Sequence, residues 1–214
     1  MLQPYSRSPE YITTLADGTI KQLNPFSGVE VWTIPGRGNR PIGVRDIAAK
    51  PLDPAEHGRH CAFCEQRYLE TPPEKSRVVR SNDGGYETRY RTSAEQLFDN
   101  VAEFRRIPNM FEILSYDYWH QNYGYVLPGR VADRRRAYLE SPAGLDHVVK
   151  VATAKLLASG RTLAEVDEMT VDDILQHTSG FFGGGHDVIV ARRHFVDGAT
   201  MDDQVASSGT LTPE

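Results

Sequence analysis

Cys61 and Cys64 are the only two cysteines in this chain of 214 residues, and two residues separate them. A Cys-x-x-Cys pair can offer two thiolates to one metal ion. Zinc takes about four ligands in a tetrahedral array, often thiolates together with imidazoles. The remaining ligands would come from the seven histidines, from carboxylates or from outside the chain. The spacing therefore predicts half of a zinc site.

The same spacing also occurs in redox dithiols, which lie where a strand of a βαβ unit runs into a helix. Here Pro51, Pro54 and Gly58 precede the cysteines and Pro72-Pro73 follow them, so the pair is expected in a loop. This setting favours a metal site over a redox pair. Two unliganded thiols remain the third alternative.

The composition indicates a globular protein that is not a general nucleic-acid binder. Hydrophobic residues make up 39% and charged residues 25% of the chain, and the net charge is −5. A mildly acidic chain argues against nucleic acid as a partner but allows a local basic pocket for phosphates. No apolar run approaches the roughly 20 residues of a membrane span. Two cysteines and a polar N-terminus without a signal-peptide pattern suggest the cytoplasm.

The first half of the chain reads as short strands separated by turns. Residues 1–18 are expected to be a flexible lead-in. Alternating apolar residues at 19–23 and 29–34, around an Asn-Pro-Phe-Ser-Gly turn, predict a hairpin. Residues 42–75 look irregular, and residues 77–90 read as strand pieces around an Asn-Asp-Gly-Gly turn.

The second half reads as helices followed by one strand. Residues 128–180 are expected to be helical because apolar residues recur at helical spacing, as at Leu145, Val148 and Ala152. Arg134-Arg135-Arg136 is expected to form a solvated helix face. A compact strand is predicted at 186–191, where His-Asp-Val-Ile-Val-Ala precedes Arg-Arg-His.

The last residues resemble the start of a helix. Thr212 can cap it, Pro213 suits its first turn, and Glu214 is favourable to the helix dipole. The coincidence of these signals predicts that the sequence continues in a longer protein.

Four segments, taken in order, resemble galactose-1-phosphate uridylyltransferases and their relatives in the histidine-triad superfamily. They are Asn24-Pro25-Phe26-Ser27-Gly28 with Pro35-Gly36-Arg37-Gly38-Asn39-Arg40-Pro41, then Cys61-Ala62-Phe63-Cys64 with Thr71-Pro72-Pro73-Glu74, then Ile107-Pro108-Asn109-Met110-Phe111, and last Gly185-His186-Asp187-Val188-Ile189-Val190 ending in His194. The stretch from about 115 to 182 has no recognised counterpart in that family.

The resemblance implies nucleotidyl transfer between a nucleotide-sugar and a sugar 1-phosphate. In the family, a histidine of a His-x-His-x-Gln motif attacks the α-phosphate, because imidazole is a good nucleophile near neutral pH. This sequence contains no His-x-His pair. The nucleotidyl-histidine is therefore expected to form outside this chain, and the chain alone is expected to be inactive.

The resemblance also implies particular site residues. Cys61, Cys64 and His194 match zinc ligands, and His186 is a fallback ligand. An extended strand would hold these two histidines about 26 Å apart, so they cannot share one metal ion. Arg37 and Arg40 match a basic loop near the nucleotide, and Asn109 matches a nucleotide-contacting asparagine. In the family an aspartate follows this asparagine, but here the next residue is Met110. The change puts in doubt whether this chain prefers uridine and contacts the ribose.

The sequence therefore predicts an α+β chain with an incomplete histidine-triad-like antiparallel sheet, a zinc knuckle and a helical insertion. The expected divisions are a lead-in at 1–18, strands with the knuckle at 19–114, the insertion at 115–182, and a strand with the start of a helix at 183–214. Two alternatives remain open: a nucleotide-sugar or dinucleotide phosphorylase of the same superfamily, and a non-catalytic, zinc-stabilised binding module. The resemblance leaves a homodimer open.

Overall fold

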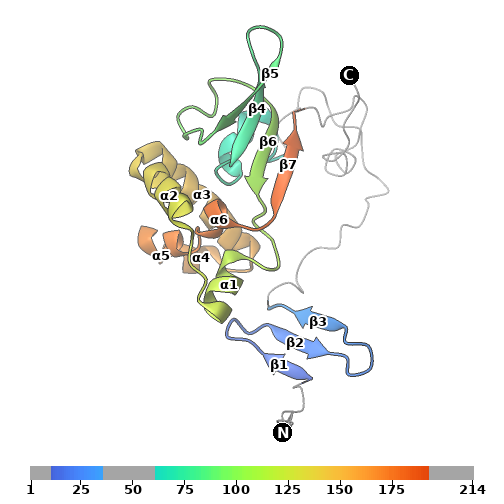
Figure 1. Ribbon diagram of the computed structural model, residues 1–214. Helices are drawn as coiled ribbons and strands as arrows, with labels where there is room; N and C mark the ends of the chain where they lie inside the picture. Colours follow the sequence, from blue (N-terminus) through green and yellow to red (C-terminus); the bar gives the residue numbers. More distant parts are fainter. Residues whose placement is uncertain (1–10, 36–60, 193–214) are drawn as a thin grey trace, which may run out of the picture.

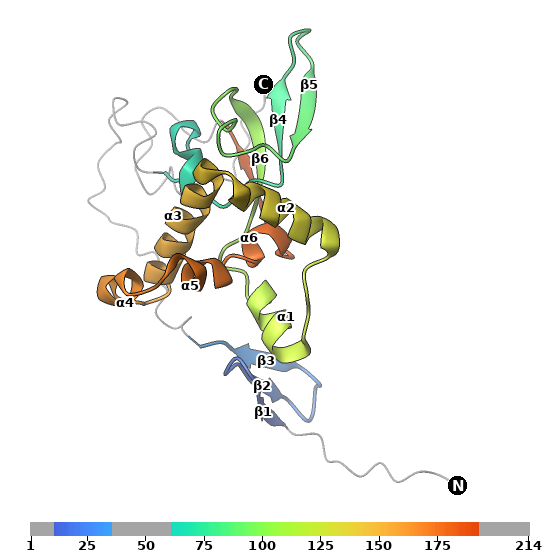
Figure 2. The same ribbon diagram turned by 90° about the vertical axis from the view of Figure 1, so that its left-hand side faces the viewer.

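The computed structural model describes residues 11–35 and 61–192. The structure contains a three-stranded and a four-stranded sheet, which lie at opposite ends of the molecule with helices between them (Figures 1 and 2). Both sheets are antiparallel. The expectation of an α+β chain is confirmed at this level.

The smaller sheet has the strand order β1-β2-β3 and consists of β1 (Ile12–Thr14), β2 (Ile20–Leu23) and β3 (Glu30–Thr33). The turn between β2 and β3 forms because the Asn24 side chain accepts hydrogen bonds from the amides of Phe26 and Ser27. Gly28 then adopts φ +70°, which glycine tolerates at little cost. The predicted hairpin is confirmed. The expectation of a flexible lead-in at 1–18 is wrong for residues 12–14, which form strand β1 and pair with β2.

The larger sheet has the strand order β5-β4-β6-β7. It is formed by β4 (Ser76–Arg80), β5 (Tyr86–Tyr90), β6 (Ala102–Pro108) and β7 (Asp187–Ala191). In the β6–β7 pair, Phe104 lies opposite Ala191 and Pro108 opposite Asp187. The sheet therefore joins a strand from the middle of the sequence to one near its end.

Six helices lie between β6 and β7 in the sequence. They are α1 (Tyr116–Tyr123), α2 (Gly129–Glu140), α3 (Pro142–Ala158), α4 (Leu163–Asp167), α5 (Val171–Gln176) and α6 (Gly180–Gly183). Local signals set several ends: capping boxes at Thr162–Glu165 and Thr170–Asp173 open α4 and α5. The helical stretch expected at 128–180 is confirmed, and the helices extend past it, since α6 continues to Gly183 with Phe181 and Phe182 buried. Among the described helices, none is both long and apolar enough to cross a membrane.

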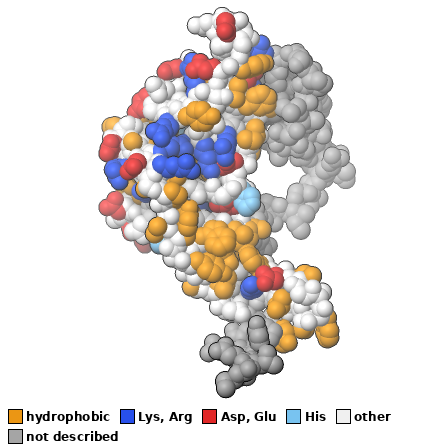
Figure 3. All heavy atoms as spheres, viewed as in Figure 1, with side chains coloured by type: hydrophobic (Ala, Val, Ile, Leu, Met, Phe, Trp, Pro, Cys, Tyr) orange, Lys and Arg blue, Asp and Glu red, His pale blue; other side chains and the backbone are white. Residues whose placement is uncertain are grey.

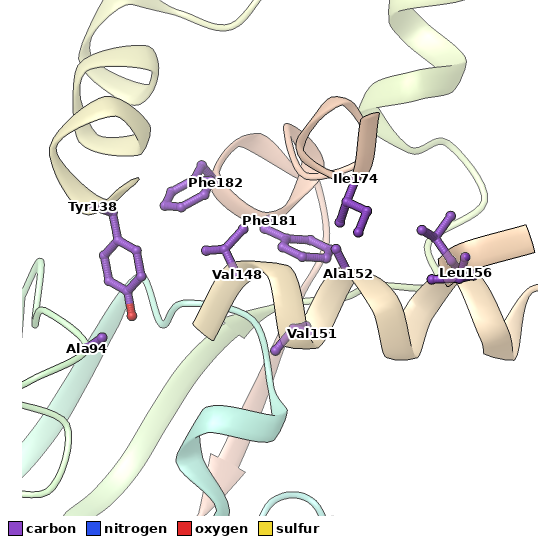
Figure 4. Close-up of a cluster of buried hydrophobic side chains, with 10 residues drawn as sticks. Ala94, Tyr138, Val148, Val151, Ala152, Leu156, Ile174, Phe181 and Phe182 are labelled. Carbon is purple, nitrogen blue, oxygen red and sulfur yellow. The ribbon is translucent and has the colours of Figure 1, made fainter. Parts of the chain in front are cut away.

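The main hydrophobic core lies among the helices, around α3 (Figure 4). Phe181 extends from α6 toward Val148 and Ala152 on α3, and Phe182 lies beside Tyr138 of α2, with ring centroids 5.8 Å apart. Helix α1 contacts the smaller sheet through a stack of Trp32 on Tyr118, with ring centroids 5.8 Å apart.

A buried polar network connects the larger sheet to the helices. We use this name for Tyr68, Thr71, Glu74, Arg77, Arg105 and His147. The Glu74 carboxylate pairs with Arg77 through one oxygen and with Arg105 through the other, the latter at 2.8 Å. All three side chains are at most 2% exposed. Arg77 also donates to the Leu97 carbonyl at 2.8 Å, and the Arg105 guanidinium lies 4.2 Å from the Tyr68 ring centroid.

His147 of α3 links this network to the helical core. Its Nε2 atom lies 2.8 Å from the Thr71 carbonyl and its Nδ1 atom 2.7 Å from the Tyr138 hydroxyl. Burial lowers the pKa of His147, since desolvation disfavours the imidazolium form. The helices are thus hydrogen-bonded to the segment that follows the cysteines.

We expect the pH dependence of stability to include a component from His147. Its pKa is lower in the folded chain than in the unfolded chain, where it is about 6.5. The unfolded chain therefore binds the proton more tightly, so the free energy of unfolding should fall as the pH drops below about 6.5. Urea unfolding at a series of pH values would measure this slope. The His147→Gln variant should be less stable but less pH-dependent in that range; an unchanged slope would contradict the assignment.

Candidate metal centre

Cys61 and Cys64 lie in a tight turn that leads directly into the 3-10 helix η2 (Glu65–Glu70). The Cys64 amide donates to the Cys61 carbonyl at 3.1 Å, and the Arg67 amide donates to the Cys64 carbonyl at 2.9 Å. Cys64 has extended backbone angles and occupies the N-cap position of η2 without a capping hydrogen bond from its side chain. The prediction that the cysteines lie outside regular strands is confirmed, although the segment after them is helical instead of irregular.

The two thiols lie close together and are shielded from solvent. Cys61 is 8% exposed and Cys64 is 3% exposed. A side-chain hydrogen bond with Cys61, together with burial, raises the pKa of Cys64 above its usual value. Two cysteine sulfurs that lie close together in a turn can bind the same metal ion. Sulfur ligands of this kind suit zinc. The residues present thus fit one half of a tetrahedral site.

The C-terminal end of β7 lies against this turn. Arg192 Nε is 3.3 Å from a carboxylate oxygen of Glu65, the residue after Cys64. Residues of the turn, of β6 and of β7 also share one narrow crevice, which is lined by Phe63, Glu65, Tyr68, Ala102, Arg105, Val190, Ala191 and Arg192. The order of strands in the larger sheet therefore brings residues near 191 to the cysteines, although about 130 positions separate them in the sequence.

His194, the expected third ligand, lies outside the described residues, two positions after Arg192. Within residues 11–35 and 61–192, no three histidines, cysteines or carboxylates gather as a metal site. The described part of the chain thus supplies the two thiols, and the ligand assignment of His194 stays a prediction.

His186 lies at the opposite end of β7 from the cysteines. Its Nδ1 atom is 3.2 Å from Glu112, whose carboxylate also accepts the backbone amides of Gly185 and His186. Because Asp187 pairs with Pro108 while Ala191 pairs with Phe104, the strand separates His186 from the turn. The fallback ligand is therefore not near the cysteines.

Asn109 lies directly after β6, at the same end of the sheet as His186. Its amide donates to the His186 carbonyl at 3.0 Å, and its side-chain oxygen accepts the Phe111 amide at 3.0 Å. That oxygen shapes the turn after β6, so a contact with a nucleotide would fall to the Asn109 side-chain NH₂ group. Arg37 and Arg40 lie outside the described residues.

The three consecutive arginines do not form the uniform solvated face that was predicted. Arg134 donates to the Glu74 carbonyl, and Arg135 donates to the Leu175 carbonyl at 2.9 Å. Arg136 alone is well exposed, at 69%, where it pairs with Asp133. The sequence pattern does not reveal these contacts, because the hydrogen-bonding carbonyls come from distant segments. The helical spacing of Arg130 and Arg134, four residues apart, would have shown that they share a face.

The fold and the site define an α+β chain whose larger antiparallel sheet carries a paired-cysteine turn at one end. A family described as "Domain of unknown function (DUF4921)" matches residues 15–214, and the chain belongs to this family. No curated protein and no solved structure matches the chain.

Proposed function

We propose that this chain is part of a nucleotidyltransferase that acts on nucleotide-sugars and sugar 1-phosphates and is stabilised by zinc. The observation that carries the proposal is the contact of Arg192 with Glu65. It supports a ligand set of Cys61, Cys64 and His194, because His194 follows Arg192 by two positions and two residues of chain span at most about 7 Å.

Zinc in such a site has a structural role. Bound to two thiolates and one imidazole, the ion would tie the start of η2 to the chain after β7. This link would fix the edge of the larger sheet. The nearby polar groups, Glu65 and Arg192, pair with one another at the rim of the site.

Nucleotide binding is assigned to the basic loop and to the turn after β6. The guanidinium groups of Arg37 and Arg40 are suited to hold phosphate oxygens through paired hydrogen bonds. Asn109 would add a polar contact from the end of β6. The proposal assigns no nucleophile to this chain, whose sequence contains no His-x-His pair.

Titration of the 214-residue chain with UDP-glucose and ADP-glucose by calorimetry tests the proposal. We expect Arg37→Ala and Arg40→Ala each to weaken binding by about tenfold or more, because each removes hydrogen bonds to a charged group. Arg136→Ala is the matched control, since it removes an exposed arginine that pairs only with Asp133 among the described residues. Unchanged affinity for both nucleotide-sugars in Arg37→Ala and Arg40→Ala would show that this loop does not bind the nucleotide.

A further inference from the structure

A basic pocket lies between α2, α6 and the ends of β4 and β5. Its volume is about 470 Å³, and it is lined by Lys75, Tyr90, Arg91, Arg130, Val131, Arg134 and Phe182. Four of these lining residues are cationic and none is acidic. Figure 3 shows Lys and Arg side chains gathered on this side of the molecule. We call this feature the arginine pocket.

Arg134 in this pocket has a lowered pKa and a buried donor atom without an acceptor among the described residues. It donates to the Glu74 carbonyl, but its Nε atom is buried and meets no acceptor in the described part of the chain. A buried donor without an acceptor is costly. Burial lowers the pKa of Arg134, and the nearby positive charge of Arg91 lowers it further. An anion in the pocket would offset the repulsion between the charges of Arg134 and Arg91.

Arg91 is placed at the pocket by a strained backbone. It is the one residue other than glycine with a positive φ in the described ranges, at +59°. A Cβ atom disfavours this conformation because it lies too close to the following carbonyl oxygen, and strain of this kind clusters at ligand-binding sites. In this conformation Arg91 lines the pocket together with Arg130 and Arg134, and its positive charge acts on Arg134.

Direct ion pairs with carboxylates do not form at the three arginines within the described ranges, although the charge of Glu74 acts on Arg134. Asp187 lies 2.6 Å from Lys75 and also 2.6 Å from Arg106, so it compensates two other cations. No ion pair of Arg91, Arg130 or Arg134 with a carboxylate forms within residues 11–35 and 61–192. The positive charge in the arginine pocket is therefore available to a ligand.

We propose that the arginine pocket binds the phosphate group of a small phosphorylated molecule. Guanidinium groups present paired N–H donors that match phosphate oxygens, and the volume falls within the range of small-molecule sites. Tyr90, Val131 and Phe182 provide an apolar wall for the rest of the ligand. The proposal is independent of the zinc site and of the loop with Arg37 and Arg40, since α2 and α6 come from the helical stretch.

Calorimetric titration of the chain with pyrophosphate tests this inference. We expect Arg130→Gln to weaken binding by about tenfold or more, because the lost contacts are hydrogen bonds between charged groups. Arg136→Gln makes the same change of charge on the same helix outside the pocket, and affinity should stay within about twofold, since exposed charges contribute little. Absence of pyrophosphate binding, or equal losses in both variants, would overturn the proposal.

A second variant separates binding from folding. Arg91→Gly removes a guanidinium but places at φ +59° the residue that best tolerates a positive φ. The thermal midpoint should stay the same or rise while pyrophosphate binding weakens by about tenfold. Retained affinity in Arg91→Gly would exclude Arg91 from the site. Arg37→Ala should leave pyrophosphate binding at this pocket intact, so the outcome is distinguishable from that of the nucleotide titration.

Discussion

Replacing Glu74 by glutamine is expected to lower the free energy of unfolding by about 3–5 kcal/mol, the cost of breaking a buried ion pair on one side. The carboxylate is the one acidic group within the buried polar network, and it pairs with both Arg77 and Arg105. Glutamine keeps the size of the side chain but removes its charge. Two buried guanidinium groups would then lack their counter-ion.

Urea unfolding followed by circular dichroism measures this loss. Glu87→Gln is the matched control, because Glu87 pairs with Arg89 at 3.2 Å on the exposed strand β5. An exposed pair contributes about 0–1 kcal/mol, so the control should remain close to the parent. A loss below about 1 kcal/mol in Glu74→Gln would show that the network does not depend on this carboxylate.

The second large effect is expected at the cysteines. Chain purified without chelators should carry zinc, weakly held and below stoichiometry, because Cys61, Cys64 and His194 supply fewer than the four ligands of a closed site. Cys61→Ser should lose this zinc. Binding of a structural metal contributes to folding, so the variant and chelator-treated parent should also unfold at lower urea concentrations.

Substitutions of His194 and of His186 provide the control for this result. His194→Ala should reduce the zinc content, whereas His186→Ala should not, because His186 lies beside Glu112 at the far end of the strand. Elemental analysis of the variants measures both. An equal zinc content in the parent and in Cys61→Ser would contradict the proposed zinc site.

The strands and helices were largely predictable because their signals are local. The Asn24 turn, the capping boxes at Thr162 and Thr170 and the apolar spacing along α3 each depend on residues a few positions apart. Strand β1 was missed because its three residues gain their stability from pairing with β2, which no local signal reports. Helix α6 was missed because burial of Phe181 and Phe182 outweighs the helix-breaking tendency of the glycines around them.

In the candidate sites, too, features formed by neighbouring residues were predictable and features formed by distant segments were not. The cysteine pair was visible in the sequence, since both thiols come from one turn. The proximity of Arg192 to Glu65 and the convergence of Arg91, Arg130 and Arg134 arise from the pairing of distant strands and helices. Arg134 is an example, because the run of three arginines suggests a solvated face, whereas Arg134 contacts the Glu74 carbonyl and the Phe182 ring from distant segments.

X-ray absorption at the zinc edge tests the central claim most directly. The proposal predicts, for the zinc-loaded chain, two sulfur ligands at about 2.3 Å and a nitrogen ligand at about 2.0–2.1 Å. The His194→Ala variant should keep the sulfur shell and lose the imidazole scattering, while His186→Ala should match the parent. A coordination shell of oxygen and nitrogen alone, without sulfur, would contradict the zinc site at Cys61 and Cys64.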